Sequence, residues 1–532
     1  MNLLDIFRNK EPEPYCSLVA PADHSQGKKQ NGVVLGLNPY THEPILDNSK
    51  NHVLVVGRER SGKTTGPVSC TAFTWDKSVF VCEPRGDVYN HTSEYRKQVL
   101  QQKVIKFEPF CNDDSSVKWN PLAEIRFRST KESEDLIKIT EYIGNHGGDS
   151  NVKEVLKILI LHLAYKNINE GKGVPTLYDV FNFLSLRFNK FGYTDYVNEI
   201  MNYPHISVEE YFSSPNLFES MAYDKSNIYD FKPFEEHFQY LLQSSHKIPD
   251  GQKISIKSQK ELKELILNVW NDEKLRNEID FTMEPYNVLL VHPLIYASLI
   301  QFNFFKAAGD ETPEEMFIST YKHLLDYMNP YLRKNICESD FSVDELLDIN
   351  NPVSLYYVCP GFEYEGKDNI EAKFMELFHN ILLYKLLDKK EPKQEEPTLL
   401  LVFDNVNTSP SYTRFYNFAK YLPFFESYGI KMIITIKMLK ALIYFVKTDE
   451  DKSILLENMK TKIYLHQLGD LGDEFEYFLR LSGNLRDEPL EAEELCRFPS
   501  TKSLIFIPNR SFFTADKISY WKHMKDKLEE LS

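Results

Sequence analysis

The sequence is poor in cysteine and contains no cysteine pair. Its 532 residues include seven cysteines, none of them in a C-x-x-C arrangement: Cys16, Cys70, Cys82, Cys111, Cys337, Cys359 and Cys496. An odd number of scattered cysteines argues against a disulfide framework and a cysteine-ligated zinc site, and favours a reducing compartment. Cys82 and Cys359 lie in apolar runs, which predicts small core residues rather than nucleophiles.

Long apolar runs are also missing. The longest ones, such as 158–164 and 398–403, fall far short of the roughly 20 apolar residues that a membrane-spanning helix needs. The N-terminal segment is interrupted by charges such as Arg8 and Glu11, so it is too polar for a secretion signal. We therefore expect residues 1–31 to be a soluble lead-in and the protein to be cytoplasmic or peripheral at the cytoplasmic face of the inner membrane.

The sequence also has no excess of basic residues, and its formal net charge is −16. This charge disfavours broad contact with nucleic-acid phosphates or anionic lipid, while a local basic patch stays open. Acidic balance also simply keeps many cytoplasmic proteins soluble. With 42% hydrophobic residues, the chain can bury a large core and is long enough for more than one domain.

What the sequence does contain is one complete motif. Residues 57–64 fit the pattern G-x-x-x-x-G-K-[ST] without a mismatch, between an apolar run at 52–56 that predicts a strand and residues that can begin a helix. Such a loop forms a nest of backbone N–H groups for phosphate, while Lys63 would reach the β- and γ-phosphates and Thr64 would bind Mg²⁺. We expect ATP and Mg²⁺ as cofactors, held by Gly57, Arg58, Glu59, Arg60, Ser61, Gly62, Lys63, Thr64 and Thr65.

Two further strands end in carboxylates. The apolar run 399–403 ends in Asp404, which predicts the second half of a phosphate-loop site, where the carboxylate helps Thr64 to hold Mg²⁺. The run 77–82 ends in Glu83 and is followed by Asp87, at the strand end where open parallel sheets place their ligands. We therefore predict metal ligands at Thr64 and Asp404, and catalytic roles for Asp404, its neighbour Asn405, Asp87 and Glu83.

The two half-sites are more than three hundred residues apart, which is too long for a loop. Apolar residues recur at helical spacing in 152–163, 176–186 with Thr176 as N-cap, 317–327 and 371–387, whereas strand patterns stand at 104–107, 353–358, 431–435, 462–465 and 504–507. The sequence thus predicts an α/β fold with a mostly parallel sheet. Its expected parts are a lead-in at 1–31, a discontinuous nucleotide-binding domain at 32–149 and 350–532, and an inserted all-helical domain at 150–349.

The order of short motifs resembles the TraG/VirD-type coupling proteins of type IV secretion, additional-strand P-loop ATPases. The landmarks are Gly32 to Gly36, the phosphate loop, Glu83-Pro-Arg-Gly-Asp87, Lys118-Trp-Asn-Pro-Leu122, Val291-His-Pro293, Leu355-Tyr356 and Tyr428-Gly-Ile430. The resemblance implies a RecA-like domain that assembles into a ring, and a motor or gate that couples ATP to substrate delivery. It also implies secretion-channel components or a membrane-anchored subunit as partners, because the family's two N-terminal membrane helices are missing from this sequence.

Three positions depart from the family pattern. The family's strand-ending Asp is followed by Glu, whereas Asp404 is followed by the neutral Asn405, which cannot be a general base. Glu426 stands where the family commonly has an Arg, and Lys437 where it has a Gln. Either hydrolysis is weak or absent, or other residues such as Asp87, Glu83 and Arg414 substitute.

The sequence is consistent with three functions. The first is an ATPase that delivers DNA or protein to a conjugative or secretion channel, and the second is a platform of the same fold that binds ATP and hydrolyses it poorly. The third, a small-molecule or nucleoside kinase, gives no reason for a long helical insertion. Aromatic residues in 188–305 would suit stacking with single strands, although core and interface roles are the more common use of such residues and are favoured here.

Overall fold

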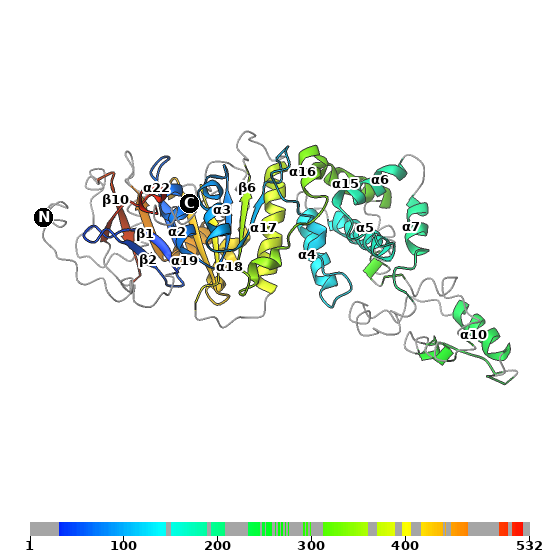
Figure 1. The fold of residues 1–532 in the computed structure, drawn as a ribbon. Helices are drawn as coiled ribbons and strands as arrows, with labels where there is room; N and C mark the ends of the chain where they lie inside the picture. Colours follow the sequence, from blue (N-terminus) through cyan, green and yellow to red (C-terminus); the bar gives the residue numbers. More distant parts are fainter. Residues whose placement is uncertain are drawn as a thin grey trace. The chain divides into compact units, whose positions relative to one another are not determined.

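The fold comprises two compact units (Figure 1). One unit contains Met1–Trp119 with Glu338–Ser532, and the other contains Asn120–Cys337. In this computed structural model the described residues are 31–144, 150–188, 193–207, 232–244, 312–359, 370–388, 396–405, 416–439, 448–465, 499–508 and 513–524, with short stretches between 247 and 298 and residue 442.

The first unit is built on an eleven-stranded sheet with the order β2-β1-β11-β10-β9-β3-β8-β7-β4-β6-β5. The strands from β9 to β5 in that order are parallel, and the strands from β2 to β10 add an antiparallel edge. The strands are β1 Val33–Leu37, β2 Pro44–Asp47, β3 Val53–Val56, β4 Ser78–Glu83, β5 Lys103–Phe107, β6 Val353–Val358, β7 Leu399–Phe403, β8 Ile430–Ile436, β9 Thr461–Leu465, β10 Lys502–Phe506 and β11 Phe513–Asp516.

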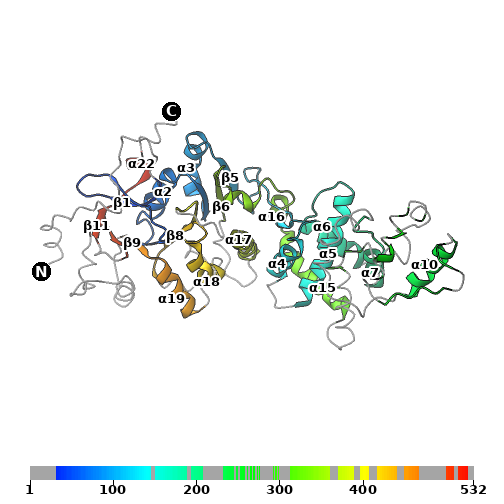
Figure 2. The same cartoon turned by 90° about the horizontal axis from the view of Figure 1, so that it is seen from below.

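Helices cover both faces of this sheet. Figure 2 shows α2 and α3 on one side and α18 and α19 on the other. The helices are α2 Ser69–Thr74, α3 Asp87–Gln98, α17 Ile370–Asp388, α18 Tyr416–Phe425, α19 Asp449–Asn458 and α22 Tyr520–His523, with short helical turns η1 Thr64–Val68 and η4 Val343–Leu347. Every residue of β3, β4 and β7 is buried, as expected for parallel strands that are covered on both faces.

The strand predictions are confirmed, and so is the predicted α/β class with a mostly parallel sheet. The run 353–358 is a strand with those bounds, and Cys82 and Cys359 are buried. Strands β1, β2 and β11 and helix α3 are additional to the sequence-based expectations. Helix α3 gives no clear apolar pattern in the sequence, since the residues that it buries are Val88, Thr92, Tyr95 and Arg96.

The regular elements in the described part of the second unit are all helices or short helical turns. Its elements are η2 Pro121–Glu124, α4 Glu132–Gly144, α5 Ser150–Asn169, α6 Leu177–Phe188, α7 Tyr193–Met201, α10 Lys232–Ser244, α15 Pro313–Leu325, η3 Asp326–Met328 and α16 Pro330–Asn335. Thr176 caps α6 as predicted, since its hydroxyl accepts the Asp179 N–H at 3.2 Å. The unit begins at Asn120 rather than near 150 because α4 packs on α5.

Within the described residues, no helix is both long and apolar enough to span a membrane.

One buried cation ties the sheet to helices α2 and α3. Arg96 is fully buried, and its guanidinium donates at 2.6 to 2.8 Å to the carbonyl oxygens of Ala72, Trp75 and Lys77, to Gln102 Oε1 and to Ser354 Oγ. These acceptors belong to the C-terminal end of α2, the segment before β4, the segment before β5, and β6. A single side chain therefore joins four neighbouring parts of the sheet unit.

Replacement of Arg96 by methionine should lower the free energy of unfolding by at least about 3 kcal/mol, because each buried carbonyl oxygen left without a donor costs roughly 1–3 kcal/mol. Urea titration followed by tryptophan fluorescence measures this change. Lys97→Met on the same helix is the matched control, since Lys97 is exposed and its loss should cost less than about 0.5 kcal/mol. Equal stability of the two variants would contradict the role assigned to Arg96.

Candidate functional site

The predicted site residues meet at the carboxyl-terminal edge of the parallel strands. Strand β8 lies between β3 and β7, with Val56 opposite Ile436 and Phe403 opposite Ile434. The next strand, β4, pairs with β7 so that Cys82 is opposite Phe403. The residues that follow these strands therefore lie together, and they are Gly57, Lys437 and Asp404, with Glu83 at the end of β4.

The loop after β3 curls around the Lys63 ammonium. Lys63 Nζ donates to the carbonyl oxygens of Gly57 at 2.6 Å and Arg58 at 3.0 Å, and its side chain is buried. Burial lowers the pKa of Lys63, while the nearby Asp404 carboxylate raises it. Gly62 has φ +97° and Arg60 φ +60°, so the tight curvature depends on a glycine and on one side-chain-bearing residue in the left-handed region.

A helix begins after the loop, as the sequence predicts, and it is short and irregular. A turn over Thr64–Val68 is broken at Gly66, which has φ −101° and ψ −106°, and α2 begins only at Ser69. Pro67 has no N–H to donate, so Val68 N–H reaches back to the Lys63 carbonyl at 3.3 Å instead. A Cβ atom at Gly66 would lie 2.7 Å from the Ile518 carbonyl oxygen, which explains why the kink has no side chain.

Asp404 joins the two halves of the site. Its Oδ2 accepts the Thr64 hydroxyl at 2.6 Å, and its Oδ1 accepts the Thr435 hydroxyl at 2.7 Å. Burial raises the pKa of Asp404, although both hydroxyl bonds and Lys63 lower it. Thr64 and Asp404 were predicted as a pair from the sequence. Thr435 was missed, because a threonine inside the apolar run of β8 carries no signal beyond strand propensity.

Asn405 extends this cluster with an amide group. It has φ +53°, and its Nδ2 donates to Thr64 Oγ1 at 3.2 Å and to Asp404 Oδ2 at 3.1 Å. Its backbone N–H donates to Thr435 Oγ1 at 2.8 Å. Asparagine is among the few residues that enter the left-handed region readily, and its amide can donate to a carboxylate where a glutamate cannot.

Glu83 caps helix α3. Its carboxylate accepts the backbone N–H groups of Val88 at 2.7 Å and Tyr89 at 2.8 Å. Burial raises the pKa of Glu83 to about 8, while these two N–H bonds lower it. Both Glu83 oxygens are thus engaged with the backbone. Asp87, in contrast, is exposed at the start of α3, so of the two predicted carboxylates it is the more accessible. Their catalytic roles stay predictions.

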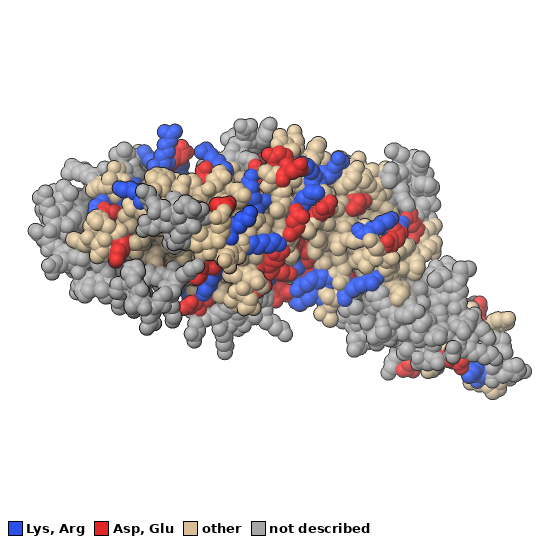
Figure 3. Space-filling view, in the orientation of Figure 1, with Lys and Arg blue, Asp and Glu red and all other residues tan. Residues whose placement is uncertain are grey.

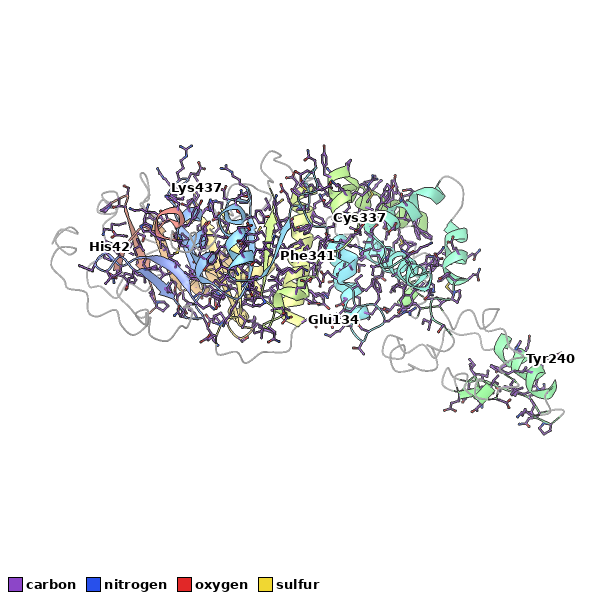
Figure 4. The ribbon with its side chains drawn as sticks, in the orientation of Figure 1. His42, Glu134, Tyr240, Cys337, Phe341 and Lys437 are labelled. Carbon is purple, nitrogen blue, oxygen red and sulfur yellow. The ribbon has the colours of Figure 1, made fainter. Side chains whose placement is uncertain are left out.

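The two charged departures from the family pattern are in ion pairs. Lys437 follows β8 on the surface of the sheet unit (Figure 4), and its Nζ lies 2.8 Å from Glu59 Oε1 of the phosphate loop. Glu426 precedes β8, at the opposite edge of the sheet from the phosphate loop, and pairs with Lys460 at 2.7 Å. Arg414, the other predicted substitute, lies outside the described residues.

One contact on the loop was not anticipated at all. Lys517, which follows β11, donates from Nζ to the Ser61 carbonyl oxygen at 3.1 Å. No local pattern in the sequence could have found it, because the two residues are 456 positions apart.

Comparison with known proteins gives the following relatives. Conjugal transfer protein TraG of Escherichia coli is 33% identical over 134 residues, which are 24% of this chain and 21% of TraG. A second Escherichia coli TraG is 31% identical over 140 residues, 25% of this chain and 22% of that protein. The aligned part of the chain thus spans about a fifth of the length of these curated relatives.

Among solved structures, the conjugative coupling protein TrwBdeltaN70 in its unbound monoclinic form has a TM-score of 0.49 at 13% identity, covering 92% of this chain and 89% of that one. The plasmid coupling protein TrwB in complex with ADP and Mg²⁺ has a TM-score of 0.47 at 13% identity, covering 92% and 90%.

The family model for type IV secretory system conjugative DNA transfer proteins matches residues 23–195 and 296–488. These two segments comprise more than half of the 532 residues, and the resemblance drawn from the sequence motifs is confirmed. The chain therefore belongs to the type IV secretory system conjugative DNA transfer family.

Proposed function

We propose that this protein binds ATP with Mg²⁺ and acts as a coupling protein that recruits DNA or protein and delivers it to a conjugative or secretion channel. The observation that carries the proposal is the 2.6 Å hydrogen bond between Thr64 Oγ1 and Asp404 Oδ2, beside the buried Lys63 ammonium. A cation and a hydroxyl–carboxylate pair in one phosphate-loop site are the donor set that a magnesium nucleotide requires.

The residues present fit this ligand. Among the described residues, the Lys63 ammonium donates to two backbone carbonyl oxygens, and bound phosphate oxygens would be stronger acceptors for it. Thr64 and Asp404 supply hard oxygen donors, which suit Mg²⁺, either directly or through bound water. Backbone N–H groups of residues 57–65 would face the phosphates.

A second candidate is a platform that binds ATP and does not turn it over. It is favoured by Asn405, whose neutral amide occupies the place of a carboxylate and donates to both Thr64 and Asp404. Lys437 and Glu426 are both held in ion pairs within this chain, which gives neither an evident role toward the γ-phosphate. Of the two predicted carboxylates, the exposed Asp87 is then the more accessible one for assisting hydrolysis.

The distribution of charge on the surface bears on the cargo. Acidic and basic side chains are interspersed on the face shown in Figure 3. Together with the net charge of −16, this mixture favours a protein cargo or a narrow, locally basic path for DNA over broad phosphate contact. The identical subunits would form a ring that docks to channel components or to a membrane-anchored partner at the cytoplasmic side of the membrane. In such a ring, ATP at the phosphate loop would drive or gate delivery of the cargo.

Lys63→Ala should raise the Kd for Mg²⁺-ATP by at least about 100-fold, because two charge-assisted hydrogen bonds to phosphate contribute roughly 1.5–3 kcal/mol each. Titration calorimetry on the purified chain measures the change. Lys97→Ala, an exposed lysine of α3, is the control and should bind as the wild type does. A wild-type chain without measurable affinity for ATP or ADP would overturn the proposed function.

Turnover separates the two candidates. ATP hydrolysis is measured across protein concentrations, with and without single-stranded DNA, and with Lys63→Ala as the blank. Hydrolysis that rises with concentration and vanishes in Lys63→Ala supports the motor. Binding without hydrolysis under all these conditions supports the platform.

Asn405→Glu should leave turnover within about threefold of the wild type, although it restores the family's carboxylate. The left-handed backbone at this position costs roughly 1–2 kcal/mol for an ordinary residue, and a second carboxylate next to the buried Asp404 is repulsive. Asn405→Asp is the matched variant, since aspartate tolerates the same backbone. A tenfold or larger gain in Asn405→Glu would show that the missing base alone limits hydrolysis.

A further inference from the structure

Lys517 contacts the phosphate loop from the far end of the chain. Its Nζ donates to the Ser61 carbonyl oxygen at 3.1 Å, and its side chain is half-buried. The next residue, Ile518, is buried and lies against Gly66 in the turn that follows the loop. The segment after β11 therefore touches both the loop and the beginning of its helix.

The backbone that carries Lys517 is held in place by its neighbours. The preceding residue, Asp516, is paired on both sides of β11, with Leu37 of β1 and with Lys502 of β10. The Lys517 backbone N–H donates to the Thr501 carbonyl at 2.8 Å. Ile518 belongs to an apolar cluster that includes Cys70 and Phe73 of α2. The ammonium is thus presented to the loop from a fixed strand end.

The peptide that Lys517 contacts precedes a glycine, so its rotation is less restricted than that of a peptide between two residues with side chains. In a trans peptide the C=O and N–H groups point in opposite directions, so a donor on the Ser61 oxygen turns the Gly62 N–H away from Lys517. Rotation of this peptide changes ψ of residue 61 and φ of residue 62. Glycine at the second position accepts either orientation without a Cβ clash, as it does at the turns that need positive φ. Gly62 has φ +97° here.

We propose that Lys517 is a positioning residue that holds the Ser61–Gly62 peptide with the Gly62 N–H facing the phosphate side of the loop. This inference rests on the proposed nucleotide function. Because the N–H is oriented before the ligand arrives, binding does not have to meet the cost of ordering this peptide. In a loop of this pattern the Gly62 N–H faces the β-phosphate. Lys517 should therefore strengthen binding of the diphosphate part of the ligand and not of the nucleoside.

The full-length chain is titrated with Mg²⁺-ADP and, separately, with magnesium pyrophosphate. Lys517→Met should weaken both ligands by a similar factor, about tenfold, as expected when one oriented phosphate donor is lost. Lys517→Arg, which keeps a cationic donor, should recover affinity to within about threefold of the wild type. Lys97→Met, at an exposed lysine of α3, is the control and should bind both ligands normally.

The outcomes are distinct. Lys517→Met with wild-type affinity for both ligands overturns the inference, and so does a loss for ADP without a loss for pyrophosphate, which assigns Lys517 to the nucleoside. If Lys517→Met does not fold by thermal melting, Lys517→Ala, which also lacks a donor, should show the same parallel weakening, and normal affinity of that variant overturns the inference. A wild type that binds neither ligand overturns the proposed function and this inference with it.

Discussion

The phosphate-loop site depends on one hydrogen bond, that between the hydroxyl of Thr64 and the carboxylate of Asp404. Its two partners are 340 residues apart, and the whole helical unit, Asn120–Cys337, lies between them in the sequence. The bond forms only if β8 enters the sheet between β3 and β7, which sets the distance between the strands that carry the two groups. Correct strand order is therefore a precondition for this site, and the insertion must leave that order undisturbed.

Around this bond, hydrogen-bond donors and a positive charge offset the cost of burying the Asp404 carboxylate. Asp404 is buried, which disfavours its ionised form, and two hydroxyl donors, one amide donor and the Lys63 ammonium compensate. The amide comes from Asn405, the residue that departs from the family pattern. Where the family resemblance implies a glutamate, this chain therefore has an amide that donates a hydrogen bond to the neighbouring carboxylate.

Much of the fold and part of the site follow from the sequence. Strand 353–358 and helix 371–387 were predictable because continuous burial and helical periodicity leave direct patterns. Helix α3 was not, because its buried face includes Thr92 and Arg96, which do not read as apolar. At the site, Thr64 and Asp404 were found through a local motif. Thr435 and Lys517 were not, since their roles arise only when distant strands become neighbours.

The kink at Gly66 and Pro67 also changes how an anion would be stabilised. A long straight helix behind a phosphate loop contributes the positive end of a macrodipole, built from many aligned peptide units. Here the turn after the loop ends at Val68, and α2 is only six residues long. Few helix dipoles then line up toward the loop, so the field at the phosphates would come mainly from formal charges and from the N–H groups of the loop itself. Phosphate affinity in this protein would accordingly respond to ionic strength and to lysine substitution more than in a loop backed by a long helix.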